Sequence, residues 1–219
     1  EEWYKLRAEF LQKKLRAIFY VKPFIGLRDD SRAILKDHSQ GINWRKIRRQ
    51  MLEKRLEEII WRNPLTKLVD LCGEASEIGY TKSRKSLSIL LKRQGINWEQ
   101  LKQKIIKRKV ILILNKDLFI DKKDIAMEAG YPENKVRSFY NDVKRWKINI
   151  DQMRREILKQ KIINMLLKKP ESEVEDFWQG IECSLTLRSF KNLLLRNDIS
   201  FREMKKQVKK LLAIAKETG

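Results

Sequence analysis

Apolar residues recur along the chain in a pattern that predicts five long helices. A large apolar residue is followed by two more, three and seven positions later, so the three lie on one face of an α-helix. The five sets begin at Trp3, Trp44, Trp98, Ile150 and Phe201. The later members are Leu6 and Phe10, Ile47 and Met51, Leu101 and Ile105, Met153 and Ile157, and Met204 and Val208. Each set predicts the first turns of one helix.

A short phrase leads into four of these helices. Residues 41–44 and 95–98 both read Gly-Ile-Asn-Trp, and residues 147–150 and 198–201 are weaker forms. The isoleucines of the phrase are 54, 52 and 51 residues apart. The third residue is Asn or Ser, which suits a helix N-cap because its side chain accepts from free backbone N–H groups. The phrase therefore predicts a helix start with a period of about 52 residues.

Shorter helices are predicted between the long ones. A basic helix precedes each phrase, at residues 31–37, 83–93, 134–145 and 186–196. A further short helix is predicted before it, at 64–75, 122–129 and 174–178, and the turns that follow the first two contain Gly79 and Gly130. Three helices with a glycine turn between the last two are typical of helix-turn-helix proteins.

The predicted fold is all-α, a tandem array of small three-helix, helix-turn-helix-like modules. Pro23 and Gly26 interrupt the first, shortened module at residues 1–40. Complete modules follow at 41–94 and 95–146, a similar module at 147–197 and a C-terminal helix at 198–219. Helical solenoids that bind proteins have periods of about 40–47 residues, so a protein-binding scaffold is the structural alternative.

The charge of the chain indicates a polyanionic partner. Lys and Arg total 50 against 29 Asp and Glu, which gives a net charge of +21. Nucleic acid neutralises such a charge well, because each phosphate contact releases a counterion. We therefore expect double-stranded DNA as the partner. The apolar run at 110–114 is too short to cross a membrane, no secretory signal is visible, and the start without Met suggests a trimmed chain.

The sequence predicts neither a catalytic site nor a metal-binding site. Cys72, Cys183 and His38 are far apart, which fits a reducing cytoplasm and gives no zinc-ligand spacing. The sequence has no phosphate-binding loop and no hydrolase or metalloprotease motif. We expect a non-enzymatic protein of the cytoplasm, associated with the bacterial nucleoid, that has no catalytic residue, cofactor, metal or small-molecule substrate.

The starts of the basic helices supply the candidate base-reading residues. A helix fits the major groove of DNA, and side chains near its N-terminus reach base edges. Contact with phosphate alone is the alternative for each residue. The candidates are Ser31, Arg32, Thr81, Lys82, Ser83, Arg84, Lys85, Asn134, Lys135, Arg137, Thr186, Arg188 and Lys191.

Basic residues at the starts of the long helices are the candidate phosphate contacts. The positive end of the helix dipole assists anion binding there, and solubilising charge is the alternative interpretation. The candidates are Arg45, Lys46, Arg48, Arg49, Lys102, Lys104, Arg154, Arg155, Arg202, Lys205 and Lys206. Because Trp3, Trp44, Trp98 and Phe201 share the apolar face, we expect them to join modules rather than to stack on bases.

The second and third modules resemble a known family. Residues 41–62 and 95–114, with the turns at Gly79 and Gly130, are similar to the C-terminal half of TnsD/TniQ-type proteins, the target-site selectors of bacterial cut-and-paste transposons. The resemblance implies recognition of an attachment site and contact with a transposition AAA+ ATPase. Those proteins also carry an N-terminal zinc-binding region, and this sequence has no such Cys and His cluster.

The sequence thus predicts site-specific binding of duplex DNA, with target recognition in transposition as the expected biology. A transcription, plasmid-replication or partition factor built from the same modules is one alternative. A helical scaffold for an acidic protein is the other.

Overall fold

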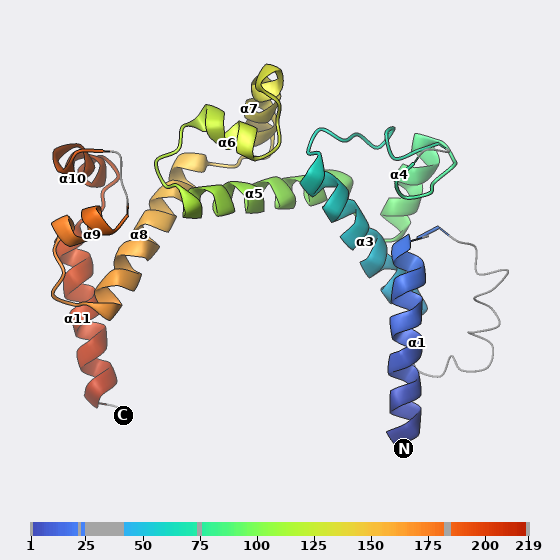
Figure 1. The fold of residues 1–219 in the computed structure, drawn as a ribbon, viewed down its shortest axis with the longest axis horizontal. Helices are drawn as coiled ribbons and strands as arrows, with labels where there is room; N and C mark the ends of the chain where they lie inside the picture. The colour runs from blue at the N-terminus through green and yellow to red at the C-terminus, as the bar shows by residue number, and fades with distance from the viewer. Residues whose placement is uncertain (1, 22, 25–41, 74–75, 182–184, 218–219) are drawn as a thin grey trace. The chain divides into compact units, whose positions relative to one another are not determined.

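The computed structural model describes residues 2–21, 23–24, 42–73, 76–181 and 185–217 (Figure 1). Within these ranges all regular secondary structure is helical and no strand occurs, which confirms the all-α prediction. The chain forms two compact units, Glu1–Lys107 and Arg108–Gly219. The division into modules at residues 40, 94, 146 and 197 stays a prediction.

Five long helices begin where the apolar pattern predicts. They are α1 (Glu2–Val21), α3 (Trp44–Arg62), α5 (Trp98–Lys116), α8 (Ile150–Lys168) and α11 (Phe201–Glu217). The cap side chains explain the last four starts. Oδ1 of Asn43, Asn97 and Asn149 accepts from the backbone N–H three residues later, at 3.0, 3.2 and 3.0 Å, and Ser200 Oγ does the same. The phrase is thus a helix-start signal, as expected.

Three ten-residue helices lie between the long ones. They are α4 (Arg84–Arg93), α7 (Val136–Arg145) and α10 (Leu187–Arg196). The fourth residue of each helix, Leu87, Phe139 or Phe190, is fully buried. Two shorter helices, α6 (Lys122–Glu128) and α9 (Val174–Gly180), occupy the predicted middle positions, and the 3₁₀ turn η1 (Glu133–Lys135) leads into α7.

The middle helix predicted at residues 64–75 does not form. The described part of this segment consists of turns and irregular backbone between α3 and α4. Asn63 Oδ1 accepts from the N–H of Leu65, and Asp70 Oδ2 accepts from the N–H of Lys67. These side chains satisfy backbone donors locally, and Pro64 has no N–H to give, so turns replace the helix.

Consecutive long helices are joined by one recurring packing contact. We number the first apolar residue of a long helix as position 0, and we call positions 0, 3 and 7 the front residues and positions 8, 12 and 16 the rear residues. In one core cluster the front residues Trp98, Leu101 and Ile105 of α5 pack with the rear residues Leu52, Leu56 and Ile60 of α3. We call this contact a joint.

The same joint occurs twice more within the two units. Ile47 of α3 packs with Leu15 and Phe19 of α1. Phe201 and Val208 of α11 pack with the three rear residues of α8, Leu158, Ile162 and Leu166. Trp44, Trp98 and Phe201 therefore join successive long helices as expected. For Trp3 the joining role stays a prediction, because Trp3 is exposed and no helix of the described chain packs on the front of α1.

The long helices α3, α5, α8 and α11 each also carry a cation at position 4, which we call the joint cation. Arg48 Nε donates to the Pro23 carbonyl at 2.6 Å, and Lys102 Nζ donates to the Thr66 carbonyl at 3.1 Å. Equivalent bonds join the Arg154 guanidinium to Ile120 O at 2.7 Å and Lys205 Nζ to Glu171 O at 3.1 Å. All four carbonyls follow the end of the preceding long helix, so these joint cations satisfy acceptors that have left the helical pattern.

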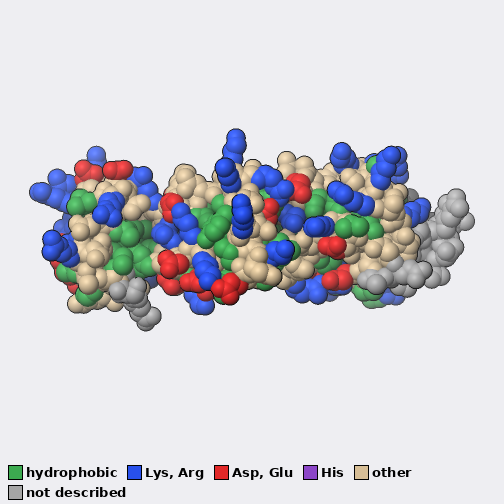
Figure 2. All heavy atoms as spheres, turned by 90° about the horizontal axis from the view of Figure 1, so that it is seen from above, with side chains coloured by type: hydrophobic (Ala, Val, Ile, Leu, Met, Phe, Trp, Pro, Cys, Tyr) green, Lys and Arg blue, Asp and Glu red, His purple; other side chains and the backbone are tan. Residues whose placement is uncertain are grey.

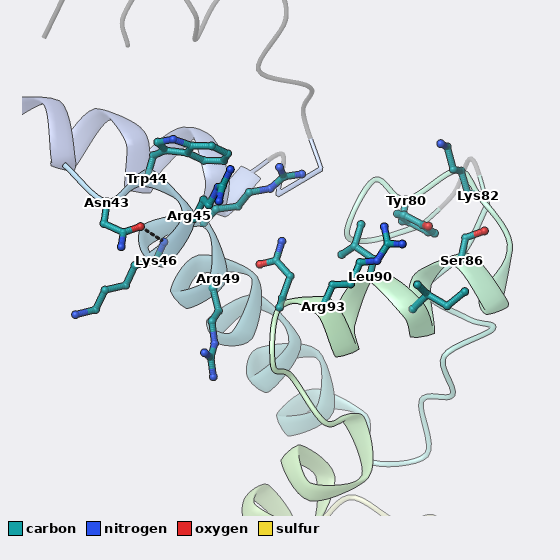
Figure 3. A pocket seen from close by; sticks show the side chains of 13 residues that line it. Asn43, Trp44, Arg45, Lys46, Arg49, Tyr80, Lys82, Ser86, Leu90 and Arg93 are labelled. Atoms are coloured by element: carbon teal, nitrogen blue, oxygen red, sulfur yellow. Dashed lines mark hydrogen bonds between the residues drawn. The ribbon is translucent and has the colours of Figure 1, made fainter. Parts of the chain in front are cut away.

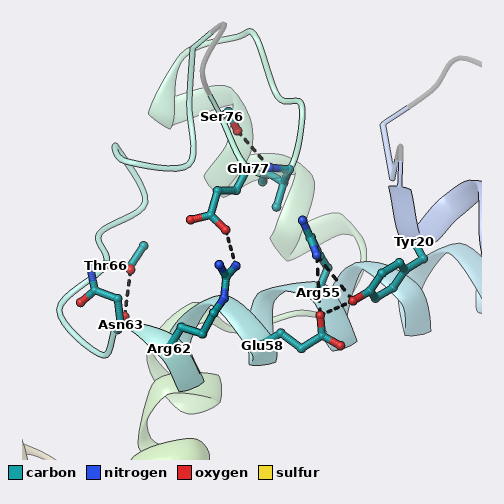
Figure 4. A network of polar contacts seen from close by, with 9 residues as sticks. Tyr20, Arg55, Glu58, Arg62, Asn63, Thr66, Ser76 and Glu77 are labelled. Atoms are coloured by element: carbon teal, nitrogen blue, oxygen red, sulfur yellow. Dashed lines mark hydrogen bonds and ion pairs between the residues drawn. The ribbon is translucent and has the colours of Figure 1, made fainter. Parts of the chain in front are cut away.

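Polar contacts reinforce the joint between α1 and α3 and the end of α3 (Figure 4). The Tyr20 hydroxyl of α1 donates to the Glu58 carboxylate of α3, and the Arg55 guanidinium lies 3.7 Å from the same carboxylate. Arg62, at the end of α3, pairs with Glu77 of the following loop. These contacts connect α1, α3 and the loop before α4.

The joint cations should support stability. Replacing Lys102, whose residue is only 8% exposed, with Met keeps most of the apolar stem and leaves the Thr66 carbonyl without its donor. We expect the free energy of unfolding to fall by about 1–3 kcal/mol, measured by denaturant titration. The control is Lys107→Met, which changes an exposed lysine of the same helix. Equal stability of the two variants would contradict the role given to Lys102.

Candidate nucleic-acid interface

A basic groove lies between the start of α3 and helix α4 (Figure 3). Its volume is about 980 Å³. No carboxylate lines it among the described residues, and its cations are Arg45, Lys46, Arg48, Arg49, Lys82 and Arg93. Trp44, Tyr80, Ile89 and Leu90 add apolar surface. The groove thus combines uncompensated positive charge with flat apolar side chains.

Local packing determines where the groove cations lie. The Arg45 guanidinium lies 5.4 Å from the centre of the Trp44 ring. Arg49 donates to the Gly95 carbonyl at 3.3 Å but stays exposed. Burial lowers the pKa of Arg48, which is tied to Pro23 as a joint cation. Arg45 on one side and Lys82 with Arg93 on the other are therefore the cations best placed to meet an anion in the groove.

The predicted base-reading residues divide into exposed and structural groups. The second residues of the three ten-residue helices, Lys85, Arg137 and Arg188, are equivalent and exposed. Thr81, Lys82 and Arg84 are also exposed. Ser83 and Thr186 are N-caps whose hydroxyl oxygens accept from the N–H of Ser86 and Ser189 at 3.4 and 3.2 Å, so helix capping already uses those oxygens. Ser31 and Arg32 lie outside the described residues.

The remaining base-reading candidates lie differently from the prediction. Asn134 and Lys135 belong to η1 rather than to α7, and Asn134 is not the N-cap of that helix. Pro132 precedes the turn, and its fixed φ favours the tight start that displaces the helix by two residues. Lys191 lies in α10, but its ammonium group pairs with Glu175 of α9 at 2.6 Å.

The predicted phosphate contacts need a larger correction. Arg48, Lys102, Arg154 and Lys205 are the joint cations, and their donors bind backbone carbonyls. Lys102 is buried, so its ammonium group is not offered to a phosphate. The cation that recurs at position 4 binds a backbone carbonyl at the joint. The sequence pattern alone does not distinguish this role from contact with a phosphate.

The other phosphate candidates are on the surface or in ion pairs. Lys104 pairs with Glu57 at 2.9 Å, and Arg155 pairs with Asp198 at 3.5 Å. Arg45, Lys46, Arg202 and Lys206 are exposed, and no ion pair in the described ranges includes them. These four remain the strongest candidates of the set.

One of the six groove cations was missed by reasoning from the sequence. Arg93 lies in the last turn of α4, where a basic side chain is favoured by the negative end of the helix dipole. The candidate residues come from the starts of helices, so Arg93 is not among them. Only the packing of α4 beside α3 brings Arg93 into a groove with Arg45.

Positive charge is also widespread outside the groove. Figure 2 shows Lys and Arg side chains scattered over the surface in view, with smaller groups of Asp and Glu among them. None of the helices described is both long and apolar enough to span a membrane.

Comparisons with known proteins give no match. No protein-family model, no curated protein and no solved structure is similar to this chain. The function must therefore be argued from the groove and the helices themselves.

The capping role of the hydroxyls can be separated from base reading. Ser83→Ala and Thr186→Ala should each lower the free energy of unfolding by about 1 kcal/mol, because a backbone donor loses its acceptor. Thr81→Ala is the matched control, since Thr81 is exposed in the loop before α4 and caps no helix. Thermal unfolding of the three variants measures the difference. A cap variant as stable as the Thr81 variant would show that the bond contributes nothing.

Proposed function

We propose that this chain binds duplex DNA at specific sites through α4, α7 and α10, with the α3–α4 groove holding the phosphate backbone. The observation that carries the proposal is the groove itself, where six cations meet and no carboxylate lies among the lining residues described. Nucleic acid carries a phosphate at every nucleotide. When a chain with a net charge of +21 binds it, the release of counterions from these phosphates contributes favourable binding free energy.

Three equivalent side chains support sequence reading. Lys85, Arg137 and Arg188 lie in the first turn of ten-residue helices that are each anchored by a buried fourth residue. A cation there reaches the O6 and N7 acceptors of guanine when its helix enters the major groove. Anchoring favours reading because a fixed helix loses less conformational freedom on binding.

The biology that fits this activity best is recognition of an attachment site in bacterial DNA transposition. The support is the resemblance of residues 41–62 and 95–114 to transposon target-site selectors. An AAA+ ATPase of the transposon is then a second proposed partner, and the bacterial nucleoid is the proposed location. A transcription, plasmid-replication or partition factor would use the same helices.

Removing charge from the groove should weaken DNA binding in a salt-dependent manner. We expect the variant Arg45→Gln, Lys82→Gln, Arg93→Gln to bind random duplex more weakly. The slope of log affinity against log salt should become shallower by about 0.9 for each phosphate that the variant no longer neutralises. Fluorescence anisotropy over a salt series measures both quantities.

The control for the groove variant carries the same change of charge elsewhere. Lys13→Gln, Lys14→Gln, Arg16→Gln removes three exposed cations of α1. It should keep most of the salt dependence. If the two triple variants show equal reductions in affinity and slope, net charge rather than the groove governs binding. A shallow slope already in the unaltered chain would favour the scaffold for an acidic protein.

Base reading predicts a different signature. Duplexes selected from a random pool by the unaltered chain should share a motif, and Arg137→Ala should relax the preference at one position. The loss on the selected site should be about 1–3 kcal/mol, with little change on random DNA. Lys144→Ala alters an exposed lysine at the other end of α7 and should leave the motif intact. Equal losses on selected and random DNA would identify Arg137 as a phosphate contact.

A further inference from the structure

Helix α1 carries a complete set of front residues that nothing covers in the described chain. Trp3, Leu6 and Phe10 are 67%, 60% and 55% exposed. Position 4 of this helix is Arg7, the equivalent of the joint cations Arg48 and Lys102. The N-terminal half of α1 therefore has both chemical parts of a joint, the apolar face and the cation.

The equivalent face is covered in the other helices. Trp98, Leu101 and Ile105 are 8%, 5% and 4% exposed, because the rear residues of α3 pack on them. In the same way, rear residues of α1 pack on the front of α3, and rear residues of α8 pack on the front of α11. Three large apolar side chains exposed on one helix face are unusual on the surface of a monomeric protein.

We propose that the front of α1 is the docking site for a further module of the same kind, distinct from the helices that the structure describes. The joints of the described chain specify the chemistry of this docking module. The module has a long helix with large apolar residues at positions 8, 12 and 16, which pack on Trp3, Leu6 and Phe10. A loop after that helix offers a backbone carbonyl to Arg7. This inference concerns assembly and does not rest on DNA binding.

A second copy of the chain does not provide this partner. The rear residues of α1, α3, α5 and α8 are apolar and already packed or buried. In α11 the equivalent positions 8 and 12 are Lys209 and Ala213, both exposed, and Lys209 pairs with Glu171 at 2.8 Å. The rear positions of α11 thus carry a charged and a small side chain, so the partner at α1 must bring its own rear residues.

The proposal can be tested by supplying a module to the full chain. Residues 44–97 are placed directly before Trp3, so that Asn97 becomes the N-cap of α1 and the added α3 copy brings rear residues. Hydrogen exchange of α1 amides should slow by about tenfold or more, because the joint buries three large side chains and opposes opening of the helix. A second fusion with residues 98–149 should act in the same way.

Leu6→Lys provides the matched control. In the unfused chain it changes an exposed residue and should alter neither exchange nor thermal unfolding, whereas in the fusions it should return α1 exchange to the unfused rate. If neither fusion slows α1 exchange, the proposal is overturned. It is also overturned if sedimentation shows that the unfused chain self-associates and that Leu6→Lys disperses it, because a second copy would then occupy the face.

Discussion

The packing of one long helix on the rear half of the preceding one is the contact on which the rest of the structure depends. Isolated helices of this length are marginal in water, so burial of Leu56, Ile60 and Trp98 in a shared core stabilises both partners. The joint cation adds a bond to a carbonyl that no longer has a helical donor. Leu87 and Leu91 of α4 bury in this same core, which sets the position of α4 beside α3 and so creates the groove.

The same joint changes the meaning of the charge pattern. Lysine and arginine return at position 4 of every long helix, and a periodic cation looks like a periodic phosphate contact. In α3, α5, α8 and α11 these side chains donate to backbone carbonyls, and Lys102 is buried. The proposed nucleic-acid binding is consequently supported less by the repeating charge than by the groove, to which Arg45 of α3, Lys82 before α4 and Arg93 at the end of α4 contribute. Position 1 is basic in α3 and α11 but acidic in α5 and α8, so the modules are not equivalent in charge.

Local hydrogen bonding decided the places where the modules differ. Asn63, Pro64 and Asp70 favour turns, so the second module reaches α4 without a middle helix. Residues 122–128 and 174–180 are helical, and at the start of the second helix the Asp176 carboxylate accepts from the Glu173 N–H as part of a capping box. At the first residue of the phrase, Gly95, Lys147 and Asp198 all have positive φ, so the chain leaves the ten-residue helix in the same way although only one of the three is glycine. Local backbone bonds accompany this conformation: the N–H of Ile148 donates to the Val143 carbonyl and that of Ile199 to the Leu194 carbonyl, as Ile96 does to Leu91 beside Gly95.

The sequence by itself determined the helical class, the four capped helix starts and the apolar face of each long helix, because apolar spacing and cap side chains act within a few residues. It also determined where α4 and α10 begin, whereas α7 begins two residues after its predicted start. Only the tertiary structure decided which cations serve the joints, that Arg93 shares a groove with Arg45, and that Trp3 has no covering partner. Those outcomes depend on which surfaces meet across long stretches of chain, as with Lys102 and Thr66, which are 36 residues apart, or Lys205 and Glu171, which are 34 apart. A lysine has the same chemical character beside a carbonyl, a carboxylate or a phosphate, and its neighbours alone distinguish the three.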